Sequence, residues 1–111
     1  MIKRTHTCGE LNKSNVGHEI HLNGWISKSR DLGGLIFIDL RYRYGKTQIV
    51  FNEENHINAF NTAKKLGLED VIGIKGVVVA RPEDAINKDI ATGEIDVEVN
   101  EISVYNESEP T

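Results

Sequence analysis

Hydrophobic and polar residues alternate in several short stretches of this chain, a pattern typical of strands with one face in a core. In residues 20–26, the apolar positions and Gly24 share one face, and the glycine predicts a bend or bulge. Gly33 and Gly34 mark a loop. Residues 35–41 (LIFIDLR) and 46–51 (KTQIVF) predict two further strands, and the four residues between them fit a hairpin turn.

The period changes over residues 55–66, where apolar residues recur at about three-residue steps, which predicts a helix of about three turns. Asn55 is the expected N-cap, and Gly67 stands in a C′ position. Residues 71–81 and 94–104 then predict a fourth and a fifth strand, separated by a long loop. A phase slip near Asn100 and Glu101 returns the last apolar residues of the fifth strand to the core side.

Three strands, one helix and two strands follow one another in the element order of an OB-fold, an all-β, five-stranded Greek-key barrel. Some other small α+β sheet fits the same order. The 111 residues suffice for one domain, which we expect over residues 1–106, with 107–111 as the start of a polar linker.

The second and third predicted strands each have an aliphatic face, which we expect in the core. This leaves Phe37 on the outer face with Arg41, Gln48 and Lys46. A turn at Tyr42 and Arg43 places Phe37 directly opposite Gln48, whereas another turn length shifts this register. The alternative is that Phe37 is a core residue and the two faces are exchanged.

An outward phenylalanine beside glutamine and cationic side chains has the chemistry of a nucleic-acid site. The ring of Phe37 can stack on an unpaired base, and the amide of Gln48 offers a donor and an acceptor to the base edge. Arg41 and Lys46 can hold backbone phosphates. An OB-fold uses the surface of these same strands for oligonucleotides.

The net charge of −4 argues against a protein that is basic over its whole surface. Residues 1–48, however, contain eight Lys and Arg against four Asp and Glu, and residues 49–111 contain five against thirteen. The positive part of the chain therefore contains the three strands of the expected binding face.

The sequence also bounds compartment and chemistry. A single cysteine forms no intramolecular disulfide, and no apolar run reaches the length of a membrane span or signal segment, so we expect a cytoplasmic protein. His6 and Cys8 lack further ligands at metal-binding spacing. A nuclease site around Asp39 is the less favoured interpretation, because Asp39 opposite Lys46 fits a cross-strand ion pair. We therefore expect no catalytic residue and no metal in this chain.

Several segments resemble the N-terminal anticodon-binding domain of bacterial-type aspartyl-tRNA synthetases, class II aspartate–tRNA ligases. They are RTHTCGEL (4–11), GWI (24–26), RDLGGLIFIDLR (30–41), QIVF (48–51) and ARPEDAINKDIATGEIDVEV (80–99). The resemblance implies that Phe37 stacks on the central anticodon base of tRNA-Asp, a uracil, and that Gln48 bonds to it. It further implies that Arg30 contacts the anticodon, that Arg81 faces the loop, and that Asp96 lies near the first anticodon base.

The chain departs from the family pattern at several positions. The run Lys28-Ser29-Arg30 replaces three arginines, which weakens the expected backbone contact of Lys28 and its neighbours. Tyr42-Arg43-Tyr44 replaces an acidic hairpin tip, Val79 stands where an arginine is frequent, and Asp96 has a shorter reach than the usual glutamate.

The resemblance also implies a parent enzyme that uses ATP and Mg²⁺ in a catalytic domain outside these residues. It implies that the parent enzyme is a homodimer and that the isolated domain is a monomer. The competing interpretation is an OB-fold protein that binds single-stranded nucleic acid without sequence preference. Such a protein needs more aromatic residues along its groove than this chain has.

Overall fold

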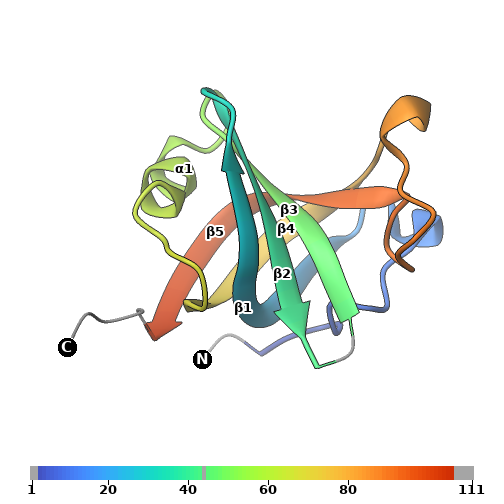
Figure 1. The fold of residues 1–111 in the computed structure, drawn as a ribbon, viewed down its shortest axis with the longest axis horizontal. Helices are drawn as coiled ribbons and strands as arrows, with labels where there is room; N and C mark the ends of the chain where they lie inside the picture. Colours follow the sequence, from blue (N-terminus) through green and yellow to red (C-terminus); the bar gives the residue numbers. More distant parts are fainter. Residues whose placement is uncertain (1–2, 44, 107–111) are drawn as a thin grey trace.

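The structure is a computed structural model that describes residues 3–43 and 45–106, and the strands within these ranges form a closed barrel (Figure 1). The expected linker at 107–111 lies outside the described residues. The elements in chain order are η1 (Lys13–Asn15), β1 (Glu19–Asp31), β2 (Leu35–Tyr42), β3 (Gly45–Asn52), α1 (Ile57–Ala63), β4 (Val71–Ala80), η2 (Glu83–Ala85) and β5 (Ile95–Asn106).

The strand order around the barrel is β1-β2-β3-β5-β4, and β1 pairs with both β2 and β4 in antiparallel fashion. The barrel closes through a short parallel contact between β3 and β5, in which Ile49 lies opposite Val97. With one helix between β3 and β4, this is the predicted five-stranded OB-fold, and the alternative α+β sheet is wrong.

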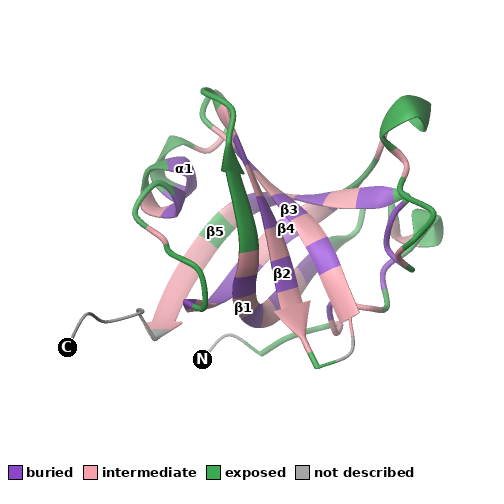
Figure 2. Cartoon of the chain, viewed as in Figure 1, coloured by how far each residue is buried: buried purple, intermediate pink, exposed green. Residues whose placement is uncertain are grey.

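The core lies inside the barrel and beneath α1, as the alternation of buried and half-buried residues along the strands shows (Figure 2). The predicted faces of β2 and β3 are confirmed, because their aliphatic positions are buried and Phe37 is half-buried on the outer face. The buried residues of these two strands are Ile36, Ile38, Leu40, Thr47, Ile49 and Phe51.

Gly24 and a neighbouring bulge let β1 curve around the barrel. A Cβ added to Gly24 would lie 2.3 Å from the carbonyl oxygen of Arg41, so the residue is needed for close approach of β2. The register between β1 and β2 shifts between Ile26 and Lys28, where Ser27 is the extra residue. The predicted bend in β1 therefore exists, but the bulge lies beyond Gly24.

The β2–β3 hairpin corrects one predicted pairing. Tyr42 pairs with Gly45, so the turn lies one residue later than expected, and Arg43 adopts a positive φ of 55°. Phe37 consequently lies opposite Val50, and Gln48 lies opposite Asp39, so the predicted Phe37–Gln48 pair is wrong. Because the register moves by two residues, every side chain keeps its predicted face.

The helix is shorter than predicted. It spans Ile57–Ala63 with His56 as N-cap, while Asn55, the expected cap, donates from Nδ2 to Glu98 Oε1 over 3.3 Å. Gly67 lies beyond the helix and is not its C′ residue. The phase slip in β5 is confirmed, because the register with β4 shifts at Asn100. No helix in the described ranges has the length and apolar character of a membrane span.

Candidate nucleic-acid interface

A pocket of about 160 Å³ opens on the outer face of β1, β2 and β3, where the loop after β4 forms its far wall. Six of the predicted site residues lie in its lining. The lining consists of Lys28, Arg30, Phe37, Asp39, Lys46, Gln48, Arg81, Asn87 and Ile90.

The bulge at Ser27 places the cations of β1 on this pocket. Strict alternation from the buried Ile26 would point Lys28 and Arg30 at the core face, but the extra residue reverses the alternation. Lys28 therefore pairs with Asp39, and Arg30 pairs with Phe37. The guanidinium of Arg30 lies over the Phe37 ring, with its Cζ 5.4 Å from the ring centroid.

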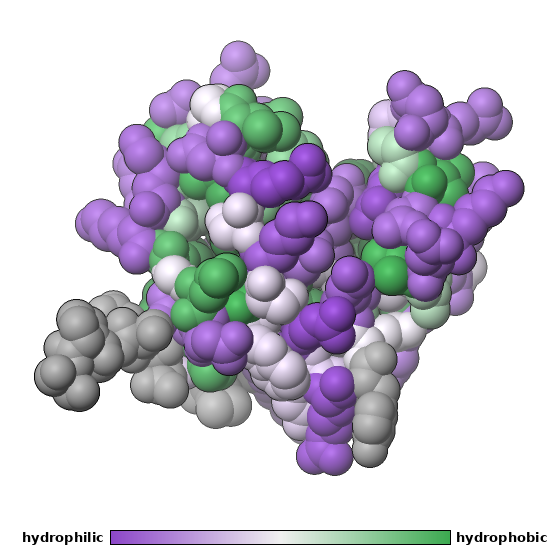
Figure 3. All heavy atoms as spheres, in the orientation of Figure 1, coloured by the Kyte–Doolittle hydropathy of each residue, from purple (hydrophilic) through white to green (hydrophobic). Residues whose placement is uncertain are grey.

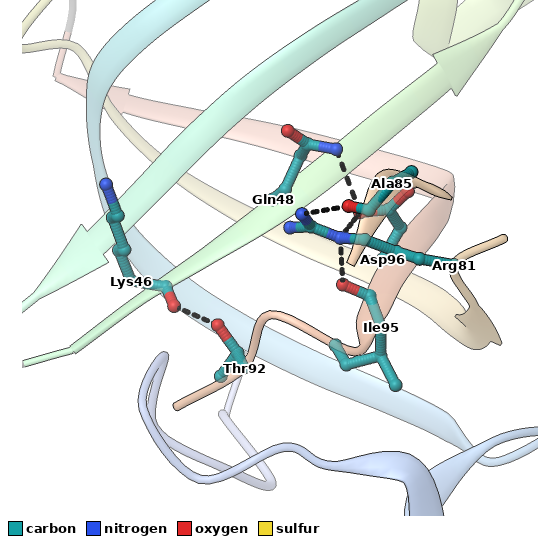
Figure 4. Close-up of polar contacts among 7 residues, drawn as sticks. All are labelled: Lys46, Gln48, Arg81, Ala85, Thr92, Ile95 and Asp96. Atoms are coloured by element: carbon teal, nitrogen blue, oxygen red, sulfur yellow. Dashed lines mark hydrogen bonds and ion pairs between the residues drawn. The ribbon is translucent and has the colours of Figure 1, made fainter. Parts of the chain in front are cut away.

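Gln48 and Arg81, which line the pocket, share a hydrogen-bonded network with Asp96, which lies behind the lining (Figure 4). Gln48 Nε2 donates to Asp96 Oδ1 over 2.9 Å, and Arg81 Nε donates to the same oxygen over 2.9 Å. The side chains of Arg81 and Asp96 are only 7% and 14% exposed. Burial raises the pKa of the Asp96 carboxyl, while the charge of Arg81 and the hydrogen bonds from Gln48 and Arg81 act in the opposite direction.

The loop between β4 and β5 is fastened to the barrel at several points. Arg81 Nη1 donates to the carbonyl oxygen of Ala85 over 3.2 Å, and the buried Thr92 donates from Oγ1 to the carbonyl oxygen of Lys46 (Figure 4). A Cβ added to Gly93 would collide with the carbonyl oxygen of Asn87, so the loop packs on itself here. These contacts make the loop a fixed wall of the pocket.

Cations dominate the pocket lining. Two carboxylates lie at the pocket, and each is paired with a cation. Asp39 lies in the lining and pairs with Lys46 over 3.7 Å, whereas Asp96 lies behind the lining and pairs with Arg81. In Figure 3, strongly hydrophilic side chains follow the face over β1 to β3. The ion pair between Asp39 and Lys46 that the sequence predicted is confirmed, although the two residues are not directly opposite.

Arg41 lies outside this pocket, in a neighbouring one that shares Lys46 and Ile90 with the first. The two pockets thus continue one another along the hairpin. Asp96 is absent from the lining, but it bonds to Gln48 and Arg81, which both lie in it.

Sequence reasoning missed Asn87 and Ile90, which line the pocket from the loop. The only available signal was the length of that loop, since long loops on rigid scaffolds often form binding sites. Within residues 3–43 and 45–106, no group of three or more metal-ligating side chains occurs.

The barrel, its cationic outer face and its outward aromatic ring define a nucleic-acid-binding OB-fold domain. The chain belongs to the tRNA anti-codon family, described as OB-fold nucleic acid binding domain, which matches residues 8–105.

Within this class, the chain is similar to aspartate–tRNA ligases, which confirms the resemblance seen in the sequence. It is 51% identical over 108 residues to the aspartate–tRNA ligase of Listeria monocytogenes serotype 4a, covering 97% of this chain and 18% of the relative. It is 46% identical over 109 residues to the aspartate–tRNA(Asp/Asn) ligase of Anaplasma marginale, covering 98% and 18%. The chain thus spans less than a fifth of the length of these relatives.

Among solved structures, asparaginyl-tRNA synthetase from Pyrococcus horikoshii superimposes with a TM-score of 0.80 at 26% identity, over 100% of this chain and 24% of that one. The aspartyl-tRNA synthetase from Entamoeba histolytica superimposes with a TM-score of 0.85 at 19% identity, over 98% and 22%. The second similarity shows the fold alone.

Proposed function

We propose that this chain is the anticodon-binding domain of an aspartate–tRNA ligase and that the pocket on β1–β3 binds the anticodon loop of tRNA-Asp. The observation that carries the proposal is that Phe37, Gln48 and Arg30 line one pocket on the outer face of the barrel. The similarity to aspartate–tRNA ligases supports the choice of RNA.

In this proposal, some contacts of the pocket accept any nucleotide and others depend on which base is bound. The half-buried Phe37 ring offers a stacking surface, which any base accepts. Gln48 offers amide groups to the base edge, which only some bases match. Lys28, Arg30 and Lys46 supply the positive charge that attracts the backbone. The central uracil of the anticodon is the base that we place on Phe37.

The parent enzyme, in this proposal, joins aspartate to tRNA in the cytoplasm as a homodimer. A catalytic domain outside this chain would bind ATP and Mg²⁺ for that reaction. The present domain would contribute the selection of the tRNA by its anticodon.

The proposal is tested by measuring the affinity of the chain for the anticodon stem-loop of tRNA-Asp and for the same stem-loop with cytosine at the central position. We expect the uracil loop to bind at least about tenfold more tightly, the effect of one well-formed base contact. Equal affinity for the two loops would contradict it.

The same measurement with an unstructured single-stranded DNA separates the alternative. A binder without sequence preference would hold this DNA and both stem-loops equally well. An anticodon domain is expected to prefer the RNA loop, whose splayed bases fit the pocket.

A further inference from the structure

The orientation of the Gln48 side chain is determined by its partner. A side-chain amide presents an oxygen on one side and a nitrogen on the other, and it can turn over by rotation about its last bond. An ionised carboxylate only accepts hydrogen bonds. Because Gln48 contacts Asp96 over 2.9 Å, it must turn its nitrogen toward Asp96 and its oxygen away (Figure 4).

Asp96 is itself held in place. Arg81 Nε donates to the same Oδ1 that Gln48 contacts and also to the carbonyl oxygen of Ile95, over 2.9 and 3.1 Å. Both members of this ion pair are largely buried, so the carboxylate has little freedom to move or to exchange its partners for water. Gln48 therefore donates its hydrogen bond to a carboxylate that is held in place, that of Asp96.

We infer that Asp96, held in place by Arg81, is a positioning residue. It fixes the direction of the Gln48 amide and thereby determines which base can form hydrogen bonds with Gln48. This inference rests on the proposed function and adds to it a specificity-determining residue that does not itself touch the base. It adds a role to Asp96 beyond the place near the first anticodon base that the resemblance implied.

The selectivity follows from the hydrogen-bonding groups of the two pyrimidines. The fixed amide presents Oε1 as an acceptor and the remaining N–H of Nε2 as a donor. Uracil matches this order with its N3–H donor and an adjacent carbonyl. Cytosine has an unprotonated N3 and a donor amino group, so in the same pose two acceptors would meet.

An amide free to turn over would lose this selectivity. Once reversed, it donates to cytosine N3 and accepts from the cytosine amino group, which matches cytosine as well as the original direction matches uracil. Stacking on Phe37 is the same in both cases, since every base has a π-face. Removal of the Asp96 acceptor is therefore expected to reduce discrimination more than affinity.

The variant Asp96→Ala tests this, with binding measured for the uracil stem-loop, the cytosine stem-loop and a stem-loop lacking the central base. We expect the ratio of the two pyrimidine affinities to fall from about tenfold or more toward one. Affinity for the loop without a central base is expected not to fall, because the phosphate contacts remain. Asp96→Glu, which keeps a carboxylate, is expected to restore discrimination.

Asp39→Ala is the matched control. Asp39 lies directly opposite Gln48 and lines the same pocket, but its carboxylate pairs with Lys46 and not with Gln48. Loss of this negative charge is expected to strengthen binding of both pyrimidine loops by the same factor. An equal loss of discrimination in Asp39→Ala and Asp96→Ala would mean that charge, and not amide direction, is responsible, which overturns the inference.

Two further outcomes are distinguishable. If the unaltered chain binds both loops equally, the proposed function fails together with the selectivity inferred here. If it discriminates and Asp96→Ala discriminates equally well while folded, the inference alone is overturned. Because Asp96→Ala leaves Arg81 buried without its carboxylate, a measurement on the unaltered chain is also needed.

The measurement on the unaltered chain is hydrogen exchange of the Gln48 side-chain amide, followed by NMR. We expect one of its two protons to exchange markedly more slowly than those of a solvent-exposed glutamine, because that proton is bonded to a largely buried carboxylate. Exchange at the rate of an exposed glutamine would show that the amide is free to turn, and would overturn the inference.

Discussion

Arg30 covers the ring of Phe37, with its Cζ 5.4 Å from the ring centroid. The contact joins a cation of β1 to the aromatic ring of β2 across a directly paired position. The guanidinium therefore occupies one face of the ring. In the proposed function, a base would stack on the other face or take the place of the guanidinium, and in both arrangements the cation would stay next to the bound nucleotide.

The first prediction concerns this ring. Phe37→Ala removes the stacking surface and is expected to weaken binding of the anticodon stem-loop by about 1–3 kcal/mol, the range for one base–aromatic stack. Titration calorimetry or fluorescence anisotropy measures the change. Ile57→Ala on α1, an exposed apolar residue away from the pocket, is the control and is expected to bind normally. Full affinity in a folded Phe37→Ala chain would remove Phe37 from the site.

Salt dependence separates phosphate contacts from base contacts. Arg41→Ala and Lys46→Ala are each expected to lower the slope of log affinity against log salt by about one, with the preference for the central base unchanged. Lys64→Ala is the control for the loss of a cation away from the pocket, because Lys64 lies just beyond α1 over the Phe60 ring. A slope that stays constant in Arg41→Ala and Lys46→Ala would show that neither side chain contacts a phosphate.

Acidification is expected to abolish base discrimination before it abolishes folding. Burial raises the pKa of Asp96, so this carboxyl gains its proton at a pH above the usual range of an aspartate. A protonated carboxyl also donates, which lets the Gln48 amide turn over. Since the raised pKa means that the folded chain binds this proton more tightly than the unfolded chain, protonation of Asp96 does not lower the free energy of unfolding.

The measurement is the ratio of affinities for the uracil and cytosine stem-loops across a pH series, with circular dichroism to follow folding. We expect the ratio to fall as pH is lowered through the raised pKa of Asp96. In Asp96→Ala the ratio is expected to be low at every pH. A pH dependence that persists unchanged in Asp96→Ala would assign the effect to another group.

A substitution at Gly93 tests whether the loop between β4 and β5 contributes to RNA binding. A Cβ at this position would lie 1.6 Å from the carbonyl oxygen of Asn87, so Gly93→Ala is expected to displace the loop that carries Asn87 and Ile90. We expect weaker binding of the stem-loop by roughly 1 kcal/mol or more with the barrel still folded, because overpacking costs about 1–3 kcal/mol locally. Binding assays combined with thermal unfolding measure both effects.

Gly34→Ala is the matched control for this prediction. Its added Cβ would have only the end of the Glu53 side chain nearby, at 3.8 Å. Normal binding and stability are expected for this variant. Unchanged binding in Gly93→Ala would mean that the loop is not part of the interface.

The sequence predicted the barrel and the faces of its strands because alternation with period two records burial directly. It did not predict the bulge at Ser27, since the pairing of β1 with β2 produces it and no glycine or proline marks it. Lys28 and Arg30 reach the pocket only through this bulge. The turn position in the β2–β3 hairpin was likewise wrong, because Arg43 adopts a positive φ that its residue type does not indicate.

The contact between Gln48 and Asp96 lay beyond sequence reasoning for a different reason. The two residues are 48 positions apart and meet because β3 and β5 run in parallel where the barrel closes, with Ile49 opposite Val97. Alternation identifies the face of each strand but not which strands become neighbours. The resemblance brought both residues to the site, and only the structure shows that they bind each other.

The most direct test of the central claim is a photochemical cross-link from the central anticodon base. A stem-loop with 5-iodouridine at that position is bound to the chain and irradiated, and the cross-linked peptide is identified by mass spectrometry. Because the iodinated ring reacts with an aromatic side chain stacked on it, we predict a cross-link to Phe37 that competing unmodified stem-loop suppresses. A cross-link confined to residues on α1 or on the far strand β4 would contradict the account.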